Sequence, residues 1–297
     1  MKLSAPAASS AERPLAGIAA NAAAFTAISI GDAITKLAVA GLPAAQTLAL
    51  RSFLIVLVLT PFFIAVQRRG APVVRTSRPW AHLTRCGLQC VSVLTFYVCL
   101  RELPLTTVTA IMFVAPSLVA LAAAPMLGER ISSAQVVALA FGLVGCMIIL
   151  RPSGDGQLFI LLLALFSAAT WALSMIMLRA LTRTESQATI FAWSNGFLLL
   201  VSAALALFEW RQPTTMDLVL IVGIAVTQLV GQFFSMTAFR IARAATIAPV
   251  QYTQLLWATF FGAIIFREWP TTPVWIGAGF IIAGGLWLVR AERRRDV

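Results

Sequence analysis

Charged residues are scarce in this chain, and their scarcity decides its class. Only 11% of the 297 residues are charged, whereas 60% are hydrophobic and the mean hydropathy is +0.91. A water-soluble domain carries about 25% charged residues. So few charges cannot cover a surface that faces water, whereas a surface in lipid must be apolar. The composition therefore predicts an integral membrane protein.

The residues that carry most enzyme chemistry are also rare. His82 is the only histidine, which excludes a relay that needs a second one. Cys86, Cys90, Cys99 and Cys146 lie in apolar segments and are interpreted as small buried residues, because zinc needs a fuller ligand set. No phosphate-binding glycine loop or nucleophile elbow is present. We therefore expect no catalytic residues, no metal and no cofactor.

The positive charge is explained by topology. The net charge is +11, carried by 20 arginines and only two lysines, and most of these residues lie between apolar runs. A basic patch on one face would indicate nucleic acid, but this distribution does not. The expected partners are the lipid bilayer and a small-molecule substrate, with no nucleic acid; a homodimer is left open.

Ten apolar stretches of roughly 19–24 residues are each long enough to cross the hydrocarbon core. They are residues 15–38, 44–66, 79–100, 105–127, 133–151, 157–180, 187–208, 216–238, 245–266 and 272–290. The gaps are short and rich in turn formers, so no soluble domain fits between them. We expect Arg85, near the start of the third stretch, to extend to the closer interface.

Lys and Arg are more numerous in the predicted loops on one side of the membrane than in those on the other. With the N-terminus inside, 16 of the 22 lie inside and five outside, and Arg51 falls within a span. This bias predicts a multi-pass protein of a bacterial inner membrane with both termini in the cytoplasm. Tryptophans near the span ends fit an interfacial belt; they are Trp80, Trp210, Trp269, Trp275 and Trp287.

The second half of the chain repeats features of the first. Shifted by 139 residues, five positions coincide: Arg101 with Arg240, Thr107 with Thr246, Glu129 with Glu268, Gly145 with Gly284, and Arg151 with Arg290. Five spans in each half would invert the second half relative to the first. The predicted fold is all-α: ten transmembrane helices in two inverted five-helix repeats. The predicted parts are a tail at 1–14, repeats at 15–151 and 157–290, and a basic tail at 291–297.

Ordered motifs carry a resemblance to a known family. Each half has a loop glutamate, in Gly128-Glu129-Arg130 and Arg267-Glu268-Trp269, followed by a glycine-bearing last span. This order resembles the EamA-type branch of the drug/metabolite transporter superfamily. The opening Asp32-Ala33-Ile34-Thr35-Lys36, followed by Gln46 and Arg51, is similar to bacterial members that transport riboflavin or S-adenosylmethionine or export amino-acid-derived metallophores.

The resemblance implies a secondary transporter of a small polar organic metabolite, vitamin-like or amino-acid-derived, that works by alternating access. An exporter of amino acids or metallophores is the alternative within the family. A membrane-embedded enzyme needs clustered His, Asp or Glu, which are dispersed here. A channel subunit is the third class, and saturable flux separates it from a transporter.

Asp32, Lys36 and Arg51 are the leading candidates for substrate binding. Asp32 and Lys36 are four residues apart and share a helix face. Charges inside a span cost about 2.5–3.5 kcal/mol each unless paired or hydrated. We therefore expect Asp32 to pair with Arg51 or Lys36. These residues form either a wall of the substrate cavity or a structural ion pair between helices.

Other polar and aromatic residues inside spans complete the predicted site. They are Tyr97, Trp171, Asn195, Gln228, Gln232, Gln251 and Tyr252. Polar groups in hydrocarbon need partners, so these side chains turn inward. The alternative for each is hydrogen bonding or packing between helices without substrate.

Four residues are predicted to act at turns or gates. Glu129 and Glu268 end equivalent spans at opposite membrane faces, although helix capping also explains them. Pro116 and Pro249 would loosen the fourth and ninth spans and assist their bending. Small residues would let helices approach closely; they are Gly142, Gly145, Gly277, Gly279, Gly284 and Gly285.

Overall fold

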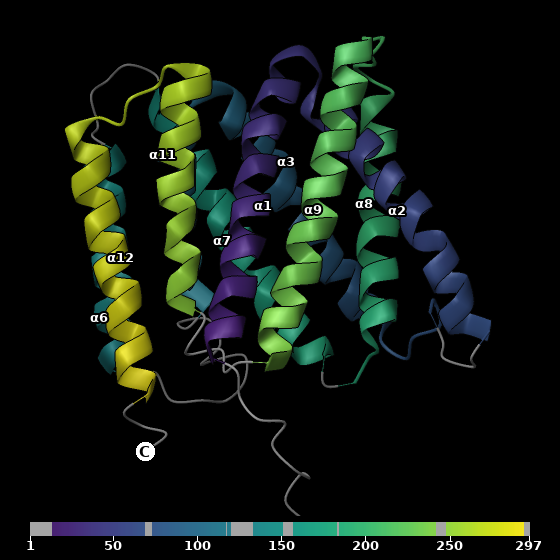
Figure 1. The fold of residues 1–297 in the computed structure, drawn as a ribbon, viewed down its shortest axis with the longest axis horizontal. Coiled ribbons are helices and arrows are strands. Elements are labelled where there is room, and N and C mark those ends of the chain that lie inside the picture. The colour runs from purple at the N-terminus through teal and green to yellow at the C-terminus, as the bar shows by residue number, and fades with distance from the viewer. Residues whose placement is uncertain are drawn as a thin grey trace, which may run out of the picture.

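The structure of this chain is a computed structural model that describes residues 14–68, 73–116, 118–119, 133–150, 157–182, 184–241 and 248–293. The regular secondary structure of the described part is entirely helical (Figure 1). Its elements are α1 (Pro14–Gly41), α2 (Ala44–Arg68), α3 (Pro79–Glu102), α4 (Leu105–Met112), α6 (Ser133–Leu150), α7 (Gln157–Leu181), α8 (Gln187–Ala206), α9 (Thr215–Ile241), the 3₁₀ helix η1 (Ala248–Tyr252), α11 (Thr253–Phe266) and α12 (Thr272–Arg293).

Each predicted span contains at least one of these helices. Six of the described helices are long and apolar enough to cross a membrane, and three shorter helices are also apolar. An all-helical membrane protein is therefore confirmed, whereas the count of ten spans stays a prediction. Glu129, the tail at 1–13 and the last residues, 294–297, lie outside the described residues.

Local sequence signals explain where several helices begin. α3 starts at Pro79, whose missing N–H costs nothing in the first turn. Ser186 caps α8 by accepting a hydrogen bond from the Thr189 N–H at 3.1 Å. Thr214 and Asp217 form a capping box at the start of α9, because each side chain accepts a hydrogen bond from the other's backbone N–H.

The fourth and ninth predicted spans are interrupted near their prolines. α4 ends at Met112, four residues before Pro116, which cannot donate a hydrogen bond to that residue. The backbone forms a 3₁₀-type turn there, because the Val114 N–H donates a hydrogen bond to the Ile111 carbonyl. Pro249 lies in η1, directly before α11. Both spans are thus interrupted next to these prolines, and a part of Pro116 and Pro249 in bending or gating stays a prediction.

The distribution of side chains is that of a protein in lipid. Large apolar side chains cover the outside, and Phe53, Leu200 and Phe208 are more than half exposed. Polar side chains such as Asn21 and Gln46 are buried inside. The five tryptophans expected at the membrane interfaces are all exposed. Water would oppose this arrangement, whereas hydrocarbon solvent favours it.

Helices of the two halves pack in reciprocal pairs. α1 packs along α9 and α3 along α7, while α2 pairs with α8 and α6 with α12. If each of the first five predicted spans is exchanged for its counterpart among the last five, the α1–α9 pair becomes the α7–α3 pair. The same exchange leaves the α2–α8 pair and the α6–α12 pair unchanged. Figure 1 shows α6 and α12 as a separate pair at one side of the bundle.

Two glycines allow α6 and α12 to meet closely. A Cβ added at Gly145 would lie 2.5 Å from the Gly277 carbonyl oxygen and 2.6 Å from Ile281. A Cβ at Gly277 would meet Ile149 at 2.5 Å, a reciprocal environment. The predicted glycine-mediated packing is confirmed for Gly145 and Gly277, whereas a Cβ at Gly279 would meet no atom within 4 Å. The partner of Gly145 in this contact is Gly277, 132 residues away, and not Gly284, which the shift of 139 aligned with it.

The two ends of the bundle are named here for the sites that follow. The terminal end is the end at which α1 begins and α12 finishes, at the bottom of Figure 1. The distal end holds the connections from α1 to α2 and from α11 to α12. The described chain therefore starts and stops at the same end, as the predicted topology requires.

Candidate functional site

A cavity of about 220 Å³ lies between helices of both halves. Its walls come from α2, α3, α7, α8 and α9 and from Thr182 just beyond α7. The lining residues are Arg51, Arg85, Gln89, Leu178, Thr182, Gln187, Ile190, Phe191, Ser194, Asn195, Leu198, Gln228, Gln232 and Met236. Thr182 and Gln187 stand at helix ends on the terminal side, whereas Arg51 is nearer the distal end. The cavity therefore extends from the bundle interior toward the terminal end.

Two buried arginines dominate the polar part of this cavity. Arg85 is 3% exposed and donates hydrogen bonds to the Ser194 hydroxyl and, at 3.1 Å, to the Gln89 amide oxygen. Arg51 is 8% exposed and donates a 2.9 Å hydrogen bond to the Tyr97 hydroxyl. Each arginine is thus held in place by neutral groups.

Four of the predicted substrate-binding residues line the cavity together. Arg51 enters from α2, Asn195 from α8, and Gln228 and Gln232 from one face of α9. The Asn195 amide donates to the Phe191 carbonyl one turn earlier, which orients its side chain. The structure thus brings these four side chains to one place; their contact with substrate stays a prediction.

Six predicted binding residues lie outside the lining of this cavity. They are Asp32, Lys36, Tyr97, Trp171, Gln251 and Tyr252. Tyr97 still contributes indirectly through its bond to Arg51. Trp171 packs against the small residues Ala115, Ala168 and Ala172.

Tyr252 has a packing role in the described structure. Its ring meets Phe113 edge-on, with the centroids 5.4 Å apart. Its hydroxyl occupies the space that a side chain at Gly285 would fill. Gly285 therefore permits a close contact between η1 and α12.

The expected ion pair of Asp32 with Arg51 or Lys36 is wrong. Asp32 accepts a 3.0 Å hydrogen bond from the Gln254 amide on α11. Lys36 bonds to Glu268 instead, and Arg51 to the neutral Tyr97. Asp32 and Lys36 are four residues apart on α1, and both contact residues of the second half.

The expectation for Arg85 is also wrong. It does not extend to an interface but is buried two turns inside α3, against α8. Gln89 and Ser194, its partners, were missed as well. The signal that was available is the spacing of Arg85 and Gln89, which places both on one helix face.

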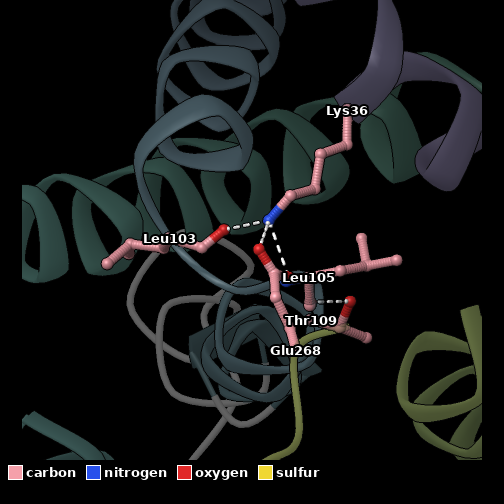
Figure 2. Close-up of polar contacts among 5 residues, drawn as sticks. All are labelled: Lys36, Leu103, Leu105, Thr109 and Glu268. Carbon is pink, nitrogen blue, oxygen red and sulfur yellow. Dashed lines mark hydrogen bonds and ion pairs between the residues drawn. The ribbon is translucent and has the colours of Figure 1, made fainter. Parts of the chain in front are cut away.

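A charged cluster closes the distal side of the bundle, and Figure 2 shows its geometry. The Lys36 ammonium lies 2.8 and 2.9 Å from the two carboxylate oxygens of Glu268 and donates at 2.6 Å to the Leu103 carbonyl. The exposed fraction is 8% for the Lys36 side chain and 28% for Glu268. We call Lys36, Glu268 and the Leu103 carbonyl the distal lock. It joins α1 and the α3–α4 connection to the α11–α12 connection.

The Glu268 carboxylate also caps a helix of the other half. The Leu105 N–H at the start of α4 donates to Glu268 at 3.2 Å. Pro104, the N-cap residue of α4, supplies no side-chain cap, so this carboxylate fills that role. The predicted capping by Glu268 is thus present, but at α4 and not at the last helix of its own half.

Backbone geometry directs Glu268 toward the lock. Arg267 adopts a left-handed conformation with φ of 56°, the only positive φ at a non-glycine residue in the described part of the chain. The next N–H, that of Glu268, bonds to the Gly262 carbonyl at 2.9 Å and ends α11. A non-glycine residue in this region is strained, and such strain persists only where the surroundings hold it.

A second link joins the halves at the distal end. The Gln46 amide at the start of α2 donates to the Arg211 carbonyl at 2.6 Å and accepts from the Arg211 N–H at 3.0 Å. Gln46 is fully buried. At the terminal end, Thr76 bonds to Glu185 at 2.6 Å, and the Trp193 indole donates to the Val74 carbonyl. Both ends therefore carry contacts between halves, but only the distal end carries an ion pair between them in the described structure.

These features define a class: a polytopic helical membrane protein with a polar, cationic cavity between two packed halves and an ion pair at one end. Comparison with known proteins gives the family. Residues 15–151 and 158–290 each match the EamA-like transporter family. The chain belongs to this family, part of the drug/metabolite transporter superfamily.

Known relatives cover most of the chain. It is 32% identical over 232 residues to a riboflavin transporter of Rhizobium johnstonii, covering 78% of this chain and 77% of that one. A riboflavin transporter of Brucella anthropi is 32% identical, with 82% and 88% covered. An S-adenosylmethionine uptake transporter of Rickettsia prowazekii is 26% identical, with 90% of each chain covered.

The fold has a solved counterpart. A crystal structure superimposes with a TM-score of 0.61 at 17% sequence identity, covering 94% of this chain and 99% of that chain. At this identity the likeness concerns the fold alone.

Proposed function

We propose that this chain is a secondary transporter that carries a small polar organic metabolite across a bacterial inner membrane. The observation that carries the proposal is the cavity between α2, α3, α7, α8 and α9, because it places buried polar side chains from both halves around one space. A site between two repeats is the arrangement used for alternating access. The two riboflavin transporters at 32% identity make a flavin-like solute the first candidate.

The two halves, 15–151 and 157–290, are proposed to be inverted five-helix repeats. The reciprocal pairing of α1 with α9 and of α3 with α7 supports this division. With both termini in the cytoplasm, the cavity lies on the cytoplasmic side of the distal lock.

The distal lock is proposed as the outer gate. It holds elements of both halves through one partly buried ion pair, which must open if the cavity is to face the other side. Gln254, which holds Asp32 one turn below Lys36, extends the same contact between α1 and α11. Opening the gate therefore separates α1 from α11.

Flux measurement tests the transport proposal. The purified chain in proteoliposomes should take up labelled riboflavin with saturable kinetics. Gln228→Ala and Gln232→Ala should each lower kcat/KM at least about tenfold if the amides contact the solute, because lost hydrogen bonds to substrate cost about 1.4 kcal/mol or more. Arg101→Gln, an exposed change at the distal end, is the control. Flux that rises linearly with concentration would indicate a channel and contradict the proposal.

Thiol labelling tests the gate. In a variant without the four native cysteines, Gln232→Cys should react with an impermeant maleimide from the cytoplasmic side. Adding Glu268→Gln should increase its labelling from the outer side, because the lock no longer holds the distal end together. Labelling from both sides that is unchanged by Glu268→Gln would remove the gate assignment and leave the transport proposal standing.

A further inference from the structure

The charge of the cavity carries an inference about the substrate. Arg51 and Arg85 both line it, and their exposed fractions are only 8% and 3%. A guanidinium does not lose its proton inside a protein. A buried cation without a counter-charge costs several kcal/mol. Two such groups in one cavity therefore need an explanation.

The hydrogen-bond partners of both arginines among the described residues are neutral. Arg51 bonds to the Tyr97 hydroxyl, and Arg85 bonds to the Ser194 hydroxyl and the Gln89 amide. The Nε atom of each arginine is buried and has no hydrogen-bond partner. Hydroxyl and amide oxygens orient a guanidinium but leave its charge uncompensated.

No acidic residue is among the described residues that line the cavity. Asp32 interacts electrostatically with Arg51 but stands beyond ion-pair distance, with its carboxylate bonded to Gln254. Glu268 is occupied by Lys36, and Glu185 by Thr76. The remaining described carboxylates that form contacts, Glu102 and Asp217, lie at exposed positions on or near helix ends.

We infer that the cavity takes a substrate that carries an anionic group, a carboxylate or a phosphate ester, which Arg51 and Arg85 bind. The planar fork of a guanidinium matches both groups. Gln228 and Gln232 would then face the uncharged part of the solute. This inference rests on the proposed transport function and narrows it, because riboflavin itself carries no ionised group whereas its phosphate ester does.

Thermal unfolding of the purified full-length chain tests the anion directly. The probes are sodium phosphate, sodium succinate and sodium chloride at equal ionic strength. We expect phosphate or succinate to raise the Tm by about 3 °C or more above chloride once the site is saturated. A response to phosphate alone assigns a phosphate ester, and a response to succinate alone assigns a carboxylate. The same Tm in all three salts would overturn the inference.

Variants show whether the response comes from the cavity. Arg51→Gln and Arg85→Gln should each abolish the anion shift, whereas Arg101→Gln, an exposed arginine at the distal end, should keep it. Arg85→Lys retains the charge and should keep part of the shift, which separates loss of the site from loss of the fold. A shift that survives in both Gln variants would overturn the assignment.

Competition in proteoliposomes completes the test. Riboflavin phosphate should inhibit the uptake of labelled riboflavin at a concentration at least about tenfold lower than unlabelled riboflavin does. Riboflavin uptake with equal inhibition by the two compounds would overturn the anionic substrate and leave the transporter intact. A rise in Tm with phosphate or succinate, but no uptake of any solute, would support the anion site and contradict the transport proposal.

Discussion

Neutralising Glu268 should destabilise the protein, because it leaves the Lys36 ammonium buried without its counter-charge. Glu268→Gln preserves the size of the side chain and removes only the charge. Breaking a fully buried pair costs about 3–5 kcal/mol. Glu268 is 28% exposed and Lys36 keeps its bond to the Leu103 carbonyl, so we expect a cost below that range, about 2–3 kcal/mol.

A double-mutant cycle isolates the ion pair from the other effects of each change. Lys36→Met and Glu268→Gln should each lower the Tm by about 5–10 °C, from about 2–4 °C per kcal/mol for chains of this size. The double variant should lose clearly less than the sum of the two, because no unpaired charge remains. The measurement is thermal unfolding in detergent, followed by tryptophan fluorescence.

The chain offers a matched control and a clear refutation. Arg101 and Glu102 form a second ion pair at 3.8 Å, but their side chains are 49% and 53% exposed. Neutralising either should change stability by about 0.5 kcal/mol or less, since exposed pairs contribute little. Strictly additive losses for Lys36→Met and Glu268→Gln would show that the lock is not a coupled pair.

Three further substitutions test particular contacts by the same unfolding measurement. Tyr97→Phe removes a buried hydrogen bond to Arg51 and should cost about 1.5–3 kcal/mol, and an unchanged Tm would contradict the bond. Gly277→Ala should cost about 1–3 kcal/mol through overpacking against α6, whereas Gly279→Ala, with no atom near the added Cβ, should stabilise by up to about 1 kcal/mol. Arg267→Gly should relieve left-handed strain and stabilise by about 1 kcal/mol, and a loss of stability would show that the Arg267 side chain contributes more than its backbone costs.

Much of the fold was predictable because hydropathy is a local property. A run of about 20 apolar residues must be helical in lipid, whatever it packs against. The helices therefore follow the predicted spans closely, except at Pro116, where α4 stops at Met112, and at Pro249, where a 3₁₀ helix precedes α11. The inward orientation of Asn195, Gln228 and Gln232 was predictable for the same reason, since lipid cannot satisfy an amide.

The placement of Arg85 was not predictable from the same reasoning. An arginine close to the start of a span can either extend to the interface or turn into the bundle, and the choice depends on what the neighbouring helix offers. Here α8 offers the Ser194 hydroxyl, and Gln89 adds a second acceptor. Neither the depth of a residue nor its helix face contains that information.

What the sequence alone determined about this protein is the solvent around it, the extent of its helices and the set of polar groups that must turn inward, because each of these follows from short stretches of chain. What only the tertiary structure decided is the partner of each charge. Lys36 and Glu268 are 232 residues apart, and nothing between them signals their contact. Ion pairing in a bundle depends on which helix ends meet, and that is set by the packing of α1, α4 and α11 around one another.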